Sequence, residues 1–106
     1  MADLNPVIGS EQHGRRPVLV ISDETTNSVM PVVTILPLTS LKKGRRVYPN
    51  EVLLKNGVAG LGADSIVLAH QIRTIAKQRL ITCLGEILDG NLRSRINEAL
   101  RVHLNL

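Results

Sequence analysis

Two runs of β-branched and aliphatic residues constrain the fold of this chain more than any other feature. Residues 17–22 read Pro-Val-Leu-Val-Ile-Ser, and residues 32–38 read Val-Val-Thr-Ile-Leu-Pro-Leu. Nearly continuous apolar runs of this length, bounded by polar and turn residues, predict buried strands. The polar residues 23–28 between them predict a connection, and residues 51–54 predict a third strand that ends at a turn over residues 55–57.

The second half of the chain changes its pattern twice. Residues 64–75 alternate between two sets of side chains, which favours a strand over a helix and places His70 and Gln71 on opposite faces. The apolar residues 80–88 predict a last strand. From Asp89 onward the apolar spacing becomes helical, so we expect the chain to end in an amphipathic helix.

About five short strands followed by one helix indicate an α+β domain built on a small, curved, mainly antiparallel sheet. A chain of 106 residues has room for one domain, over residues 1–106, and excludes a two-domain enzyme. It contains no Trp, no Phe and one Tyr, so aliphatic side chains must fill the core. Such a core leaves little surplus stability, and dimerisation would add buried surface.

Cysteine usage and the absence of targeting patterns indicate the compartment. Cys83 is the single cysteine, so it cannot form an internal disulfide, and its apolar neighbours predict burial. No apolar run approaches the roughly 20 residues that span a bilayer, and the start of the chain lacks the pattern of a signal peptide. We therefore expect a cytosolic protein.

The charge distribution suggests a polyanionic partner. Thirteen Lys and Arg residues against nine Asp and Glu residues give a net charge of +4. Four of the thirteen lie within residues 42–46, which predicts a mobile cationic loop. A run of this kind either binds phosphate groups or forms a solvated surface turn, and charge alone does not decide between the two.

Few side chains are suited to catalysis. His13, His70 and His103 are scattered and there is no CxxC pair, so we expect no metal and no other cofactor. The nucleophile motif Gly-x-Ser-x-Gly is absent. Two histidines such as His13 and His70 can cleave RNA by general acid-base chemistry, although isolated histidines are more often surface or structural residues.

Four segments together carry a resemblance to a known family. They are residues 3–21, which include Gly-Ser-Glu-Gln and Arg-Pro-Val-Leu-Val-Ile, residues 36–40 (Leu-Pro-Leu-Thr-Ser), residues 64–80, which include His-Gln-Ile-Arg-Thr-Ile, and residues 97–100 (Asn-Glu-Ala-Leu). In this order they resemble the MazF/PemK family of bacterial toxin endoribonucleases. The resemblance covers nearly the whole chain.

The resemblance implies an SH3-like β-barrel with a C-terminal helix, a homodimer, and sequence-specific, metal-independent cleavage of single-stranded RNA. By position, Arg16 matches the catalytic arginine of the family and Thr39 its catalytic threonine. In such cleavage the 2′-hydroxyl attacks the adjacent phosphate, and a planar guanidinium suits the doubly charged phosphorane. Thr39 can donate a second hydrogen bond, but a hydroxyl is a poor base, so the group that removes the 2′ proton stays open.

The resemblance also implies RNA-binding residues on several segments, because amides and carboxylates can read the edges of unpaired bases and lysines can contact phosphates. These candidates are Ser10, Glu11, Gln12, Ser40, Lys42, Lys43 and Gln71. The plainer alternatives are a turn at residues 9–12 and an exposed strand residue at Gln71. Arg73 either contacts phosphate or pairs with Asp64, and we favour the structural role. His70 lies where related sequences often have an acidic residue, so the cleavage motif cannot be transferred.

Partners and departures from the family follow from the same resemblance. We expect a cognate antitoxin whose flexible, acidic segment covers a basic RNA groove. Met1-Ala2 stands where the family has a longer, aromatic first strand, so that strand is expected to be shortened or missing. One alternative is therefore an inactive remnant that binds RNA or antitoxin. A CcdB-like gyrase inhibitor is disfavoured, because those toxins act through a C-terminal Trp-Gly-Ile that this chain lacks.

Overall fold

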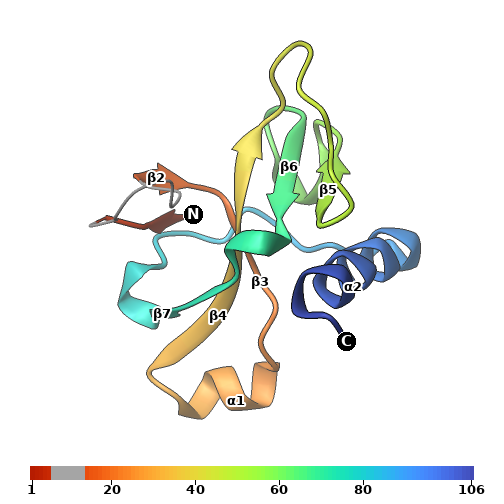
Figure 1. The fold of residues 1–106 in the computed structure, drawn as a ribbon. Helices are drawn as coiled ribbons and strands as arrows, with labels where there is room; N and C mark the ends of the chain where they lie inside the picture. The colour runs from red at the N-terminus through yellow and green to blue at the C-terminus, as the bar shows by residue number, and fades with distance from the viewer. Residues whose placement is uncertain (6–13) are drawn as a thin grey trace.

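The computed structural model describes residues 1–5 and 14–106. In these residues short strands surround one long strand, and a helix lies at the C-terminus (Figure 1). The elements are β1 (Ala2–Asp3), β2 (Arg15–Arg16), β3 (Val18–Val20), α1 (Glu24–Val29), β4 (Val32–Ser40), β5 (Glu51–Leu54), η1 (Val58–Gly60), β6 (Ser65–Leu68), η2 (Ala69–Gln71), β7 (Arg73–Ala76), η3 (Lys77–Arg79) and α2 (Gly90–Leu104).

The nine-residue strand β4 organises the sheet, because it pairs with three other strands. At Ile35 it pairs with Val20 of β3 and with Arg73 of β7, so β3 and β7 lie on opposite edges. Its C-terminal half pairs with β6, and β6 pairs with β5. Every pair among the described strands is antiparallel. The expected mainly antiparallel sheet with a C-terminal helix is confirmed, and within the described pairs it is open between β3 and β5.

The expectation of one continuous strand over residues 64–75 is wrong. β6 ends at Leu68, η2 makes one helical turn, and β7 begins at Arg73. All four residues of β6 are buried, so its two faces are covered and simple alternation does not describe it. Since η2 interrupts the strand, His70 and Gln71 lie in a helical turn and are not on opposite faces of a strand.

The polar connection over residues 23–28 contains a short helix, α1, that the sequence pattern did not indicate. Asp23 caps it, because its side chain accepts a hydrogen bond from the backbone N–H of Thr26 at 3.1 Å. No residue of α1 is buried. The helix therefore lacks the apolar stripe by which amphipathic helices are recognised in sequence.

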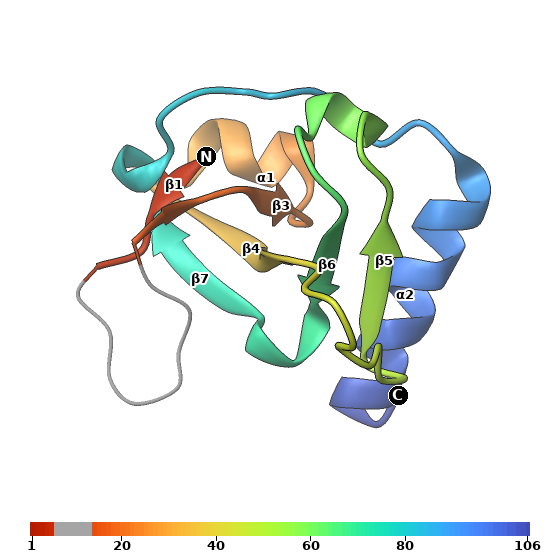
Figure 2. The same cartoon turned by 90° about the horizontal axis from the view of Figure 1, so that it is seen from above.

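The predicted last strand over residues 80–88 is also absent from the described structure, where this segment makes one isolated bridge, between Leu80 and Ala2. Figure 2 shows the segment running from η3 past η1 to α2. Ile87 is buried, but Cys83 is exposed, so the prediction of a buried cysteine is wrong. Its first residues pair with the N-terminus, where the N–H of Ile81 donates to the carbonyl oxygen of Met1 at 2.9 Å, and its later residues pack closely against η1 at Gly85.

The C-terminal helix α2 is confirmed, and it begins after Asp89, where the apolar spacing of the sequence becomes helical. The side chain of Asp89 accepts hydrogen bonds from the backbone N–H groups of Asn91 and Leu92 at 2.8 and 3.3 Å, which caps the helix start. Ile96 and Ala99 on its inner face pack against the sheet. No helix in the described chain is both long enough and apolar enough to cross a bilayer.

Two aliphatic clusters form the core, as the composition predicted. The larger cluster lies between the sheet and α2, and the smaller lies under β1. The larger includes Leu36, Leu38, Val52, Leu54, Val67 and Ile96, and the smaller includes Ala2, Leu4, Val33, Ile35 and Ile75. Because both clusters use β4, that strand is held rigidly from two sides.

Candidate nucleic-acid interface

A hollow of about 340 Å³ lies between β2 and the C-terminal end of β4, and we call it the β2–β4 hollow. Strands far apart in the sequence contribute its walls, and its described lining contains three cations and no acidic side chain. The lining residues are Arg15, Arg16, Pro17, Leu38, Thr39, Ser40, Lys42 and Ser65. Positive charge beside hydroxyl groups is suited to a phosphodiester.

Arg16 is held in this hollow by a contact with β4. Its strand, β2, pairs with β1 through Ala2. Its Nη1 donates a hydrogen bond to the carbonyl oxygen of Leu38 at 3.2 Å. The guanidinium is therefore fixed beside the residue that precedes Thr39 in β4.

The hydroxyl groups of the hollow come from two paired strands. Thr39 is half-buried and pairs with Ile66 of β6, and Ser40 pairs with Ser65. The Ser65 hydroxyl is buried and donates to the carbonyl oxygen of Ala63 at 3.0 Å. Ser40 is exposed at the rim. Of the residues predicted to act on RNA, the structure thus brings Arg16, Thr39, Ser40 and Lys42 to one hollow.

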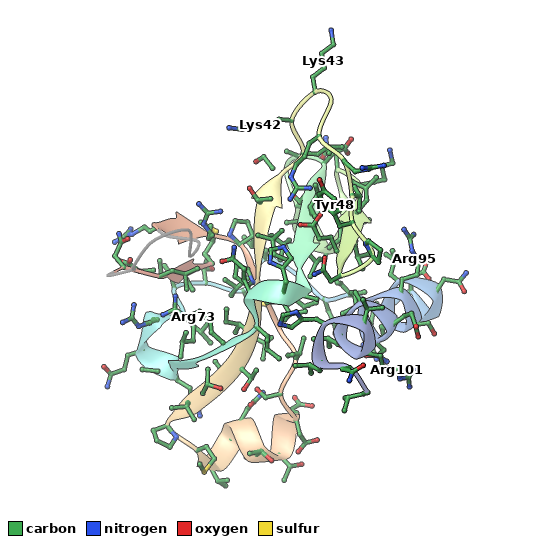
Figure 3. The ribbon with its side chains drawn as sticks, viewed as in Figure 1. Lys42, Lys43, Tyr48, Arg73, Arg95 and Arg101 are labelled. Carbon is green, nitrogen blue, oxygen red and sulfur yellow. The ribbon has the colours of Figure 1, made fainter. Side chains whose placement is uncertain are left out.

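Residues 42–46, expected to form a mobile cationic loop, form in the structure a loop whose residue Arg45 is held by a contact with the sheet. Lys42 lines the hollow, while Lys43 stands at the tip of the loop and points away from the molecule (Figure 3). Arg46 lies over the ring of Tyr48, 5.8 Å from its centroid. Arg45 is engaged by a buried carboxylate and is not available as a phosphate contact.

That carboxylate is Glu51, at the start of β5, and sequence reasoning missed it. Its side chain is 2% exposed and accepts two hydrogen bonds from Arg45, at 2.9 and 2.8 Å. It also accepts one from the backbone N–H of Tyr48 at 3.1 Å and contacts Nε2 of His70 at 2.9 Å. The signal in the sequence was an acidic residue that opens an apolar strand and is separated by four residues from the end of a basic run.

These contacts set the charge state of Glu51. The hydrogen bonds from Arg45 lower the pKa of the Glu51 carboxyl from 4.5 to about 2, against the opposing effect of burial. The hydrogen bonds from His70 and the Tyr48 N–H contribute to the same lowering of this pKa. The same pair raises the pKa of Arg45. Glu51 is therefore an anion at every pH at which the protein would act.

Gln71 and His70 lie away from the β2–β4 hollow. Gln71 is half-buried in η2 and is not among the described residues that line the hollow. His70 instead lines a second hollow of about 640 Å³ with Tyr48, Glu51 and His103. Because Glu51 holds its Nε2, His70 has a structural partner and is not poised beside Arg16.

Arg73 and Asp64 do not pair with each other in the structure. The Asp64 carboxylate accepts a hydrogen bond from the backbone N–H of Asn56 at 2.8 Å. Arg73 lies on β7, and its Nη1 is buried without a hydrogen-bond partner among the described residues. The contact proposed between the two is therefore wrong.

The remaining predicted residues lie outside the described structure. Ser10, Glu11 and Gln12, the predicted RNA-binding turn, fall in residues 6–13, as does His13. Among the described residues, no group of three or more His, Cys, Asp and Glu side chains is arranged to hold a metal ion.

Comparison with protein families and characterised proteins gives consistent matches. Residues 1–104 match the family model described as PemK-like, MazF-like toxin of type II toxin-antitoxin system. The chain is 40% identical to endoribonuclease EndoA of Bacillus subtilis (strain 168) over 106 residues, covering 99% of this chain and 89% of that protein. It is 38% identical to endoribonuclease MazF9 of Mycobacterium tuberculosis over 109 residues, covering 98% and 90%.

Solved structures agree with the sequence matches. The fold is similar to that of MazF from Deinococcus radiodurans, with a TM-score of 0.81, 31% identity, and coverage of 99% of this chain and 90% of that one. It is also similar to a mycobacterial endoribonuclease solved in complex with its cognate antitoxin, with a TM-score of 0.78, 28% identity, and coverage of 99% and 88%.

Proposed function

The chain belongs to the PemK-like, MazF-like toxin family of type II toxin-antitoxin systems, and on this premise we propose that it is a sequence-specific, metal-independent endoribonuclease that cleaves single-stranded mRNA. The observation that carries the proposal is the convergence of Arg16 and Thr39 on one cationic hollow. Relatives at 38–40% identity over nearly the whole chain are endoribonucleases.

The reaction requires little covalent chemistry from the protein. The 2′-oxygen of one nucleotide forms a bond to the adjacent phosphorus, and the bond from that phosphorus to the 5′-oxygen of the next nucleotide breaks. The products are a 2′,3′-cyclic phosphate and a 5′-hydroxyl, with the 2′ proton lost and one proton gained by the leaving oxygen. The task of the enzyme is to align the attack and to stabilise the phosphorane.

Arg16 and Thr39 supply the stabilisation in this proposal. The guanidinium of Arg16, held by the Leu38 carbonyl, faces the non-bridging phosphoryl oxygens with charged donors. Thr39 donates a second hydrogen bond to the same phosphate. Because both groups are fixed by β4, they need not reorganise when charge develops.

The other proposed residues hold the RNA strand. Lys42 contacts a flanking phosphate from the rim of the hollow, and Lys43 extends the cationic track. Ser40 adds a hydroxyl at the rim. Gln71 and the segment Ser10, Glu11 and Gln12 read base edges along the strand, further from the reacting bond.

Partners follow from the family and from the charge of the hollow. We propose that the toxin acts in the cytoplasm as a homodimer and is inhibited by a cognate antitoxin, as in the mycobacterial complex. Three cations at the hollow, Arg15, Arg16 and Lys42, would attract an acidic antitoxin segment that excludes RNA.

The decisive experiment is incubation of the purified protein with a long single-stranded RNA in EDTA, followed by mapping of the new ends. We expect cuts at a short recurring sequence, each leaving a cyclic phosphate, and no cuts in a 2′-O-methyl RNA of the same sequence. RNA that is retained but intact would mark an inactive remnant and overturn the proposal. Inhibition of DNA gyrase without RNA cleavage would point to the CcdB-like alternative.

A further inference from the structure

We propose that Glu51 is a positioning residue for RNA binding: its buried carboxylate anchors the loop between β4 and β5 so that Lys42 stays at the β2–β4 hollow. This inference rests on the proposed function, since Lys42 contacts RNA only if the chain binds RNA. It concerns a residue that lies outside the hollow and acts through Arg45.

The first link runs through the backbone of the loop. Residues 42–45 form a tight turn, in which the N–H of Arg45 donates to the carbonyl oxygen of Lys42 at 3.0 Å. Gly44 has a φ of 81°, the left-handed conformation that a turn of this shape requires at its third position. The position of Lys42 is therefore coupled directly to that of Arg45.

The second link runs from Arg45 to the sheet. Its guanidinium meets both oxygens of the Glu51 carboxylate in a bidentate pair, which fixes orientation as well as distance. Glu51 pairs with Leu68 of β6, so the carboxylate stands on a rigid strand. The Tyr48 N–H binds the same carboxylate, and the Glu51 N–H donates to the Tyr48 carbonyl at 2.9 Å. The C-terminal end of the turn and the residues that follow it are thereby tied to β5.

The loop has little else to hold it. Lys42, Lys43, Gly44, Arg46, Val47 and Tyr48 are all exposed, and outside this network Leu41 donates to the carbonyl oxygen of Asp64 at 2.9 Å at the start of the loop. An exposed segment with few buried contacts loses order when its anchor is removed. A lysine on a loosened loop must then lose more conformational freedom to bind a phosphate.

Loop order gives the first test, and it does not depend on RNA. Arg45→Met breaks the anchor, while Arg46→Met is the matched control, because it removes the same charge from the next residue without touching Glu51. We expect trypsin to cut after Lys42 and Lys43 at least several-fold faster in R45M than in the native protein, and at the native rate in R46M. Equal rates in all three proteins would overturn the inference.

RNA binding gives the second test, a double-mutant cycle with Lys42→Met measured on an uncleavable 2′-O-methyl RNA. In the native and R46M backgrounds, K42M should weaken binding by roughly 3- to 10-fold and reduce the salt slope by about 0.7, the value for one phosphate contact on a single strand. In the R45M background, K42M should change neither the affinity nor the slope. An unchanged effect of K42M in R45M would refute the positioning role.

A pair of substitutions that leaves the net charge unchanged tests whether the effect of R45M comes from misfolding or from the lost positive charge. Arg45→Met with Glu51→Met removes the anchor, leaves the net charge of +4 unchanged, and replaces a buried ion pair with apolar side chains, a change that proteins often tolerate. This variant should also abolish the effect of K42M. If K42M retains its effect there while the native protein cleaves RNA, the inference falls and the proposed function stands. If the native protein neither binds nor cleaves RNA, both fall.

Discussion

The guanidinium of Arg16 donates to the backbone carbonyl of Leu38 across 3.2 Å, which places it one residue from Thr39 in a neighbouring strand. The contact joins β2, a strand of two residues, to the long strand β4. An arginine on so short a strand would otherwise sample many rotamers. In the proposed function, this fixed position lets Arg16 present organised charge to a phosphate, and the described residues contain no metal cluster that would do so.

Replacing Arg16 with alanine should nearly abolish RNA cleavage. Loss of one preorganised donor costs about 3–4 kcal/mol of transition-state stabilisation, or two to three decades in rate. The measurement is the single-turnover rate on a defined RNA. Arg95→Ala is the control, since Arg95 lies on α2, on the opposite side of the molecule from β2 (Figure 3). Cleavage by R16A within a few-fold of the native rate would remove Arg16 from the mechanism.

Replacing Thr39 with valine tests the hydroxyl at constant shape. Without the second hydrogen bond to the phosphate, the single-turnover rate should fall by at least ten-fold, and Thr39→Ser should recover part of it. Thr34→Val is a control on the same strand, because Thr34 hydrogen-bonds to Thr74 at 2.9 Å and does not line the hollow. Equal rates for T39V and T34V would contradict the assignment.

Acid should destabilise the protein through Glu51. Its pKa is about 2 when folded and near 4.5 when unfolded, so the unfolded state binds the proton first as the pH falls. The stabilisation is complete above about pH 4.5, declines as the pH drops toward 2, and amounts to about 3 kcal/mol.

Urea unfolding at several pH values between 7 and 2.5 measures this effect. The Glu51→Gln protein should be less stable at neutral pH, because Arg45 loses its anionic partner, and should lose less of its remaining stability in acid. Parallel pH profiles for the two proteins would show that Glu51 titrates normally.

The close packing of residues 80–88 against η1 should require glycine at two positions. A Cβ built on Gly85 would lie 2.5 Å from the carbonyl oxygen of Ala59, and one on Gly60 would lie 2.2 Å from that of Leu84. Gly85→Ala should therefore lower the free energy of unfolding by about 1–3 kcal/mol. Gly62→Ala is the matched control with open space around it, and its stability should stay within about 0.5 kcal/mol of native. Denaturant unfolding compares the two.

Local pattern was sufficient for much of the fold. The strands β3, β4 and β5 and the helix α2 lie where apolar runs, a turn and a helix cap predicted them. The aliphatic core follows from a composition with a single aromatic residue. For the site, the family resemblance singled out Arg16 and Thr39, and the structure places both at one hollow.

Other features depend on neighbours that a linear pattern does not record. Residues 64–75 alternate like one strand. Only three residues of β4 lie between Ile35 and Thr39, however, while six lie between their partners Arg73 and Ile66, and the chain accommodates the three extra residues as η2. Residues 80–88 have the composition of a strand, but beyond the bridge between Leu80 and Ala2 they pack against η1 and pair with no strand in the described structure.

The sequence by itself indicated the family through the resemblance of four segments. It also determined the aliphatic core and the order of the main strands, because periodicity, turn residues and caps act over a few neighbouring residues. Only the tertiary structure decided that Arg45 pairs with Glu51 while Lys42 lines the hollow, although Arg45 and Lys42 lie in the same basic run. Burial of a carboxylate and the geometry of its donors separate these two roles, and burial is a property of the packed chain.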